Sequence, residues 1–136
     1  MKTFEMKGRK IVEGVVEGEA LVTSEPISFM GSINPKTGYV IEKGHDIEGA
    51  WLKDKILVFP CSKGSTGGSY MLYDVVKNGV GPRGIINIEA ESIVVIGAIV
   101  AKLPMVDKID ISKIKTGDYI YLDATNGIVK VQRKDD

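Results

Sequence analysis

The chain has 136 residues and a mass of 14.7 kDa, which fits one domain spanning residues 1–136 and is too small for separate substrate and cofactor domains. Its 18 basic residues balance 18 acidic ones, so the overall charge favours neither nucleic acid nor an anionic membrane surface as a partner. The longest apolar stretch, 93–101, has about nine residues, and the N-terminus carries no secretion signal, so we expect a cytoplasmic protein with no membrane span.

Short runs of β-branched residues separated by glycines predict a strand-rich domain. The expected strands are 9–17, 19–23, 39–41, 55–59, 84–88 and 92–100. We expect the first two to join near Gly18. The run 55–59 is almost entirely apolar, as is typical of a strand buried on both faces, and 84–88 and 92–100 follow the same pattern.

One helix is expected at 69–78, directly after a glycine-rich segment. Ser69 is expected to be its N-cap, and Gly79 suits the position just beyond its end, where the backbone often turns left-handed. A second, short helix is expected at 89–91.

The C-terminal part predicts a β-hairpin. Alternating residues at 118–123 and 128–131 flank Asn126 and Gly127, a pair that favours a type I′ turn because both residues tolerate positive φ. The expected fold class is therefore α/β, with a strand-rich core, one or two helices on its face and a hairpin at the end.

The glycine-rich segment, 61–69, is the best candidate for a functional site. It follows the apolar strand and leads into the helix, an arrangement that presents backbone N–H groups and the positive end of a helix dipole to an anion. The order of residues matches neither of the common phosphate-binding patterns, G-x-x-x-x-G-K-[ST] and G-x-G-x-x-G. On its residues alone, the segment is equally compatible with an anion-binding turn and with a tight connection.

Several segments of the chain, in order, resemble the swivel domain of aconitases, and most closely that of the aconitase X family. They are 18–22, 25–38, 44–49, 56–65 and 103–107. Gly64 and Ser65 match the loop whose serine is the base in that family. Many aconitase X chains have Cys at the next position, where this chain has Thr66, which favours the archaeal two-subunit branch over the fused bacterial hydroxyproline dehydratases.

The resemblance implies a swivelling β/β/α domain that acts as the small subunit of a hydro-lyase. The implied reaction dehydrates (R)-5-phosphomevalonate to trans-anhydromevalonate 5-phosphate, a step in mevalonate-based isoprenoid synthesis. Ser65, as an alkoxide, would accept the proton, and the residues implied to bind the substrate are Lys63, Gly64, Thr66 and Gly67. Such an alkoxide needs strong stabilisation, which the backbone amides of the loop can supply.

The same resemblance implies a heterodimer with a large catalytic subunit, which would carry an iron–sulfur cluster, expected to be [4Fe–4S]. This chain has one cysteine, Cys61, so we expect it to hold no such cluster and no metal by itself, and to be active only with the large subunit. Cys61 follows an apolar strand and has no histidine nearby in the sequence, which favours a packing role.

Other side chains leave alternatives open. Ser62 is a rival base in the same loop, and Lys63 could simply face solvent. His45 lies in a glycine-bounded turn and is expected to be exposed. Arg83 could reach the substrate or the partner, or be a plain turn residue. We expect Trp51 to pack in the core, and the pair at 29–30 to be better placed for docking.

Two other functions also remain open. One is an aconitase X-type dehydratase for another hydroxy acid, such as a hydroxyproline. The other is a non-catalytic swivelling carrier, suggested by the Thr-Gly-Asp turn at 116–118. Carriers of that type need a phosphorylatable histidine in their glycine-rich loop, and the loop at 61–69 has none.

Overall fold

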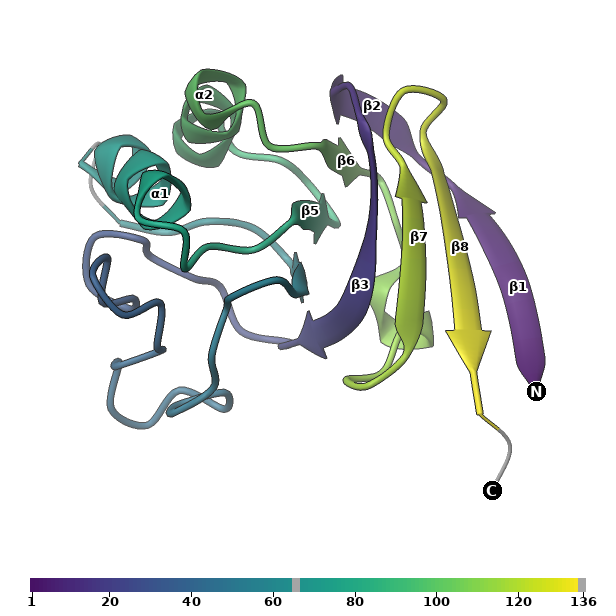
Figure 1. Ribbon diagram of the computed structural model, residues 1–136, viewed down its shortest axis with the longest axis horizontal. Helices are drawn as coiled ribbons and strands as arrows, with labels where there is room; N and C mark the ends of the chain where they lie inside the picture. Colours follow the sequence, from purple (N-terminus) through teal and green to yellow (C-terminus); the bar gives the residue numbers. More distant parts are fainter. Residues whose placement is uncertain (65–66, 135–136) are drawn as a thin grey trace.

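The computed structural model describes residues 1–64 and 67–134, which form one curled sheet with two helices against one of its faces (Figure 1). The strands follow the spatial order β1-β8-β7-β3-β4-β5-β6-β2. In chain order, the elements are β1 (Lys2–Lys7), β2 (Arg9–Val12), β3 (Val15–Val22), β4 (Ile56–Phe59), α1 (Gly68–Lys77), β5 (Gly84–Asn87), α2 (Ser92–Ala101), β6 (Met105–Asp107), the 3-10 helix η1 (Ile111–Lys113), β7 (Tyr119–Asp123) and β8 (Ile128–Arg133).

The sheet has a parallel half and an antiparallel half, which meet at β3. The first part of β3, 15–19, pairs antiparallel with β7, and its last part, 20–22, pairs parallel with β4. β4, β5 and β6 continue the parallel half, whereas β7, β8 and β1 form the antiparallel layer. The antiparallel layer folds over the parallel strands on the side away from the helices, which gives three layers and confirms the expected α/β class.

Two hydrophobic cores separate these layers, and β4 contributes to both. Leu57 and Phe59 point to the core beneath the helices, and Ile56 and Val58 point to the core beneath the antiparallel layer. All four are fully buried, so the strand shows no alternation of apolar and polar residues. The prediction of a strand buried on both faces at this position is confirmed.

The strand boundaries near the N-terminus differ from the prediction. Gly18 lies inside β3, where a Cβ atom would come within 2.8 Å of the Asp54 carbonyl oxygen, so this glycine permits a close approach and ends no strand. The chain turns instead at Gly14, whose φ of +137° favours glycine. The predicted strand at 39–41 is wrong, since Tyr39 and Val40 make only isolated bridges.

The apolar run 92–100, predicted as a strand, is the helix α2. Glu91 begins this helix, because its carboxylate accepts a hydrogen bond from the Ile93 N–H at 3.1 Å. Glu91 itself has an extended backbone, so the predicted short helix at 89–91 is also wrong. In a short run that is apolar throughout, the pattern of apolar residues does not distinguish a strand from a buried helix. Here the run is a helix, and its Gly97 packs against Leu72 of α1.

The helix α1 confirms the expected helix at this position, but its first residues differ from the prediction. Gly67 occupies the N-cap, and the Ser69 hydroxyl donates to the Ile93 carbonyl of α2 at 2.8 Å. Gly79 follows the helix with a φ of +76°, as expected.

The C-terminal hairpin is also confirmed, but its turn is longer than predicted. Residues 124–127 connect the strands, and of the Asn126–Gly127 pair only Gly127 has a positive φ. Asn126 instead donates its N–H to the Asp123 carboxylate at 3.1 Å, so the predicted type I′ turn is wrong. In the part of the chain that the structure describes, no helix has the length and apolar character needed to cross a membrane.

Candidate functional site at the glycine-rich loop

The glycine-rich loop leaves the carboxyl end of β4 and enters α1, at the edge where the parallel strands β4, β5 and β6 all end. Ligands of α/β proteins commonly bind outside this edge of a parallel sheet. Ser65 and Thr66, the predicted base and one of the predicted substrate contacts, lie outside the described residues. Their roles, and those of Gly64, Gly67 and Lys63 in substrate binding, stay predictions.

The first part of the loop is bound to the segment 26–33, which follows β3. The Ile27 N–H donates to the Cys61 carbonyl at 3.3 Å, and the Lys63 N–H donates to the Ile27 carbonyl at 3.0 Å. Gly64 has a φ of +97°, and a Cβ atom there would lie 2.6 Å from the Ser28 hydroxyl oxygen. Glycine is therefore required at this position both for its backbone conformation and for the close approach of Ser28.

The rival serine, Ser62, is buried and its hydroxyl donates to the Glu91 carboxylate. Burial disfavours the charged form of Glu91, but the hydrogen bonds from Ser62 and from the Ile93 N–H outweigh it and lower the pKa of this carboxyl. A carboxylate with a lowered pKa is a weak acceptor for the Ser62 proton. We therefore interpret Ser62 as a structural residue, whose hydrogen bond to Glu91 connects the loop to the start of α2.

Lys63, in the glycine-rich loop, forms an ion pair with Glu42. Its ammonium lies 3.0 Å from one oxygen of Glu42, and the Ser32 hydroxyl donates to the other oxygen. The hydrogen bonds from Ser32 and then Lys63 lower the pKa of Glu42, so the carboxylate is charged at neutral pH. Lys63 is about half exposed, and an anionic substrate would compete with Glu42 for it.

The N-terminus of α1 follows the loop directly. Gly67 has helical φ and ψ values of −61° and −15°, the helix has no acidic residue in its first turn, and no side chain of residues 1–64 or 67–134 caps it. Since the first N–H groups of a helix have no partner inside it, this end can offer donors and a positive partial charge to an anion.

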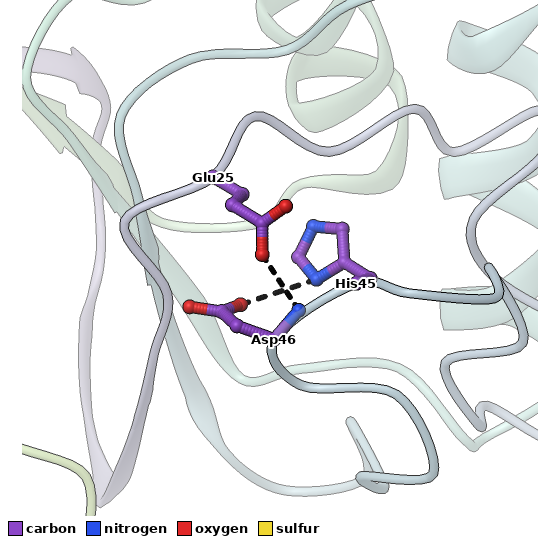
Figure 2. Close-up of side chains that lie close together, drawn as sticks. All are labelled: Glu25, His45 and Asp46. Carbon is purple, nitrogen blue, oxygen red and sulfur yellow. Dashed lines mark hydrogen bonds and ion pairs between the residues drawn. The ribbon is translucent and has the colours of Figure 1, made fainter.

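His45 lies in a hydrogen-bonded cluster with Glu25 and Asp46, close to the same edge of the sheet (Figure 2). Contrary to the prediction, the imidazole is fully buried. Its Nε2 lies 3.0 Å from the Pro26 carbonyl oxygen, which can only accept, so Nε2 donates to it. Nδ1 lies 3.3 Å from the Ile47 nitrogen and 3.2 Å from an Asp46 carboxylate oxygen.

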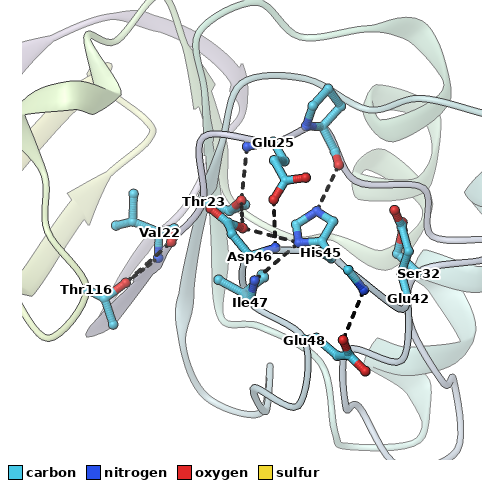
Figure 3. Close-up of polar contacts among 12 residues, drawn as sticks. Val22, Thr23, Glu25, Ser32, Glu42, His45, Asp46, Ile47, Glu48 and Thr116 are labelled. Carbon is cyan, nitrogen blue, oxygen red and sulfur yellow. Dashed lines mark hydrogen bonds and ion pairs between the residues drawn. The ribbon is translucent and has the colours of Figure 1, made fainter.

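The carboxylates of this cluster are bonded within the protein as well (Figure 3). Asp46 accepts the Thr23 hydroxyl, and Glu25 accepts the Asp46 N–H at 2.6 Å. One ligand-type atom from each of the three side chains lies within 4.8 Å of the others, a spacing compatible with a metal ion. Because a protein donor already occupies an acceptor atom on each of the three side chains, the cluster is better explained as a support that fixes the turn at 44–49 beside residues 23–26.

Four other residues that the sequence singled out lie outside the glycine-rich loop. Arg83 precedes β5, at the opposite edge of the sheet, where its N–H donates to the Lys55 carbonyl, so it does not face the loop. Trp51 is 39% exposed and stacks on Tyr39, which makes the prediction of a core position wrong. Phe29 is buried, and Met30 beside it is 50% exposed, so of this pair only Met30 is available for docking.

Glu42, Glu91 and Asn87 were not singled out by the sequence, although they shape the site. Glu42 and Glu91 bind loop residues that are 21 and 29 positions away in the chain, so no local spacing announces them. Asn87, fully buried at the end of β5, donates to the Phe59 carbonyl at 2.9 Å and so joins the ends of β4 and β5. Buried polar residues of this kind are recognisable only once the strand order is known.

Comparison with known proteins gives matches along almost all of the chain. A family model described as aconitase X swivel domain matches residues 5–131. A Thermococcus sibiricus protein named phosphomevalonate dehydratase small subunit is 55% identical over 127 residues, covering 93% of this chain and 98% of that protein. A protein of the same name from Methanococcoides burtonii is 46% identical, with 96% of this chain and 98% of that protein covered.

A solved structure gives the same result for the fold. The crystal structure of Thermococcus kodakaraensis aconitase X in its holo form superimposes with a TM-score of 0.93 at 49% identity. The alignment covers 95% of this chain and 98% of the matched chain. The similarity therefore extends over nearly the full length of each of these proteins.

Proposed function

This chain belongs to the aconitase X swivel-domain family, and from that premise we propose that it is the small subunit of a dehydratase that acts on phosphomevalonate. The observation that carries the proposal is the match to relatives named phosphomevalonate dehydratase small subunit, at 55% and 46% identity over 98% of their length. The alternatives, a dehydratase for another hydroxy acid and a non-catalytic carrier, have no comparable support.

In the proposed reaction, (R)-5-phosphomevalonate loses water to give trans-anhydromevalonate 5-phosphate. Ser65 accepts the proton from the carbon next to the carboxylate, the carbon–carbon double bond forms, and the hydroxyl group departs. We expect a [4Fe–4S] cluster on the large subunit to supply the Lewis acid for that hydroxyl. This chain has a single cysteine, so its own residues do not fit such a cluster, and we expect activity only in the two-chain complex, in the cytoplasm.

Two features of the described residues support Ser65 over Ser62 as the base. The Ser62 hydroxyl is directed at Glu91, whereas Ser65 follows Gly64, as the base follows glycine in the family. α1 begins three residues after Ser65, and no side chain among the described residues caps it; amides at such an end stabilise a developing alkoxide.

The test is steady-state turnover of phosphomevalonate by the small chain reconstituted with its large subunit. We expect Ser65→Ala to lower kcat by about a thousandfold, the usual effect of losing a general base, while the matched Ser62→Ala variant stays within about tenfold of wild type. Activity of Ser65→Ala within a few-fold of wild type would remove Ser65 from the mechanism. Dehydration of a hydroxyproline in place of phosphomevalonate would favour the alternative substrate.

A further inference from the structure

The outer face of α2 is unusually apolar for a helix at the surface. None of its ten residues is charged, and Ile96, Ile99 and Val100 are 53%, 56% and 57% exposed. Tyr70, on the neighbouring helix α1, is 74% exposed. A surface helix normally places polar residues on its solvent side, so an exposed apolar face of this kind indicates an interaction site.

This face borders a groove between the two helices, which we call the α1–α2 groove. It has a volume of about 460 Å³. Its lining residues are Ser69, Tyr70, Tyr73, Ser92, Ile93, Ile96, Gly97 and Val100. The helices are close together because Gly97 has no side chain, and a Cβ atom there would lie 3.0 Å from Leu72. Two tyrosines beside aliphatic side chains form a surface suited to an apolar partner with a few hydrogen-bonding groups.

The groove begins at the glycine-rich loop. Ser69, in its lining, is the second residue of α1 and is bonded to the Ile93 carbonyl of α2. At Gly68, a Cβ atom would lie 3.2 Å from Ile93, which lines the groove. The end of the glycine-rich loop therefore packs directly against the groove. A protein that covers the groove at this end therefore lies directly beside the loop.

The outward face of the antiparallel layer has a different chemistry. Among its exposed residues are Glu5, Lys7, Glu17, Glu19 and Lys130. Charged side chains are depleted from the buried centres of protein interfaces. Of these two faces, the one with the α1–α2 groove is better suited to permanent burial against another chain.

We propose that the α1–α2 groove and the exposed face of α2 form the docking surface for the large subunit. The proposal rests on the proposed function, which requires a second chain, with the cluster that this chain cannot hold, to reach the glycine-rich loop. A chain seated on this surface meets that requirement, because the surface continues into the loop through Ser69 and Ile93. The contacting surface of the large subunit is then apolar, with side chains that fill the groove beside Tyr70 and Ile96.

The test measures binding of the small chain to its purified large subunit by calorimetry, without substrate. Ile96→Lys places a charge at the centre of the surface and should raise Kd at least about a hundredfold, since an unpaired buried charge opposes association. Val15→Lys is the matched control, because Val15 is 51% exposed on the antiparallel layer, and it should bind like wild type. Val100→Ser is a less disruptive variant, for use if Ile96→Lys does not fold. It should raise Kd about tenfold.

These binding measurements can refute the proposed docking surface in three ways. Wild-type affinity of folded Ile96→Lys and Val100→Ser, or no binding by wild type, overturns the proposal. So does a result in which Ile96→Lys dissolves a dimer of the small chain but leaves large-subunit binding intact, since the occupant is then a second copy. A complex that forms through the groove but does not dehydrate phosphomevalonate supports the docking surface and refutes the proposed function.

Discussion

The antiparallel layer and the loop end of the parallel strands both hold carboxylates in hydrogen bonds, but with different partners and to different degrees of burial. In the antiparallel layer, Asp118 is almost fully buried and receives two hydrogen bonds from Arg133, at 2.9 and 2.7 Å. At the loop end, Glu91 and Glu42 accept serine hydroxyls, and Glu42 also pairs with the half-exposed Lys63.

The difference indicates what each region contributes. The Asp118–Arg133 pair joins the end of β8 to the turn before β7, so it holds structural elements together. The serine–glutamate contacts arrange segments that surround the glycine-rich loop, beside a start of α1 that no described side chain caps. We therefore expect changes in the antiparallel layer to affect stability, and changes around the loop to affect turnover.

The largest expected effects on stability come from truncating a buried leucine in each of the two hydrophobic cores. Their effects on turnover should differ. Leu122→Ala empties a fully buried position beneath the antiparallel layer and should lower the free energy of unfolding by about 2–5 kcal/mol, measured by urea denaturation. Turnover per folded complex should not change. Leu72→Ala, equally buried beneath α1, should cost a similar amount and also lower turnover, because α1 positions the loop. Equal losses of turnover in both variants would refute the separation.

The next effect is the pH dependence of the Asp118–Arg133 pair. Hydrogen bonds from Arg133 lower the pKa of Asp118 despite its burial, so folding favours the charged carboxylate. Its contribution is complete above the unfolded pKa of about 3.9 and is lost as the pH falls through the lower folded pKa.

Asp118→Asn should cost about 2 kcal/mol at neutral pH, the scale of hydrogen bonds to a charged group. The difference from wild type should shrink as the pH is lowered below about 4, in urea titrations at several pH values. Glu42→Gln, at the loop end, should show a pH dependence in the same direction but a smaller difference from wild type, because the carboxylate of Glu42 is partly exposed. A difference that stays constant with pH would contradict a role for the charge of Asp118.

The smallest stability effect is expected for Ser62→Ala. The substitution removes one hydrogen bond to Glu91, while the Ile93 N–H still caps α2, so unfolding should become easier by about 1 kcal/mol. Turnover should change little by comparison with Ser65→Ala. A loss of turnover above about a hundredfold without a larger change in stability would make Ser62 the better candidate for the base.

The sequence predicted the parts of the fold whose signals are local. The run 55–59, apolar except for Lys55, and the hairpin with its Gly127 turn were recognisable because composition and turn residues act over a few positions. The run 92–100 was mistaken for a strand, since an apolar run carries no information about which neighbour will cover it. β1 was missed, because charged residues alternate with Phe4 and Met6 on a strand that buries only one face.

For the site, the sequence by itself determined the glycine-rich loop, its place between a buried strand and a helix, and the resemblance to the aconitase X swivel domain. These depend on residues that are adjacent in the chain. Only the tertiary structure decided that Ser62 is bound to Glu91, that Lys63 is paired with Glu42, that His45 is buried and that Arg83 lies at the opposite edge. The reason is physical: each of these contacts depends on strand order and helix packing, which bring together residues separated by about twenty or more positions.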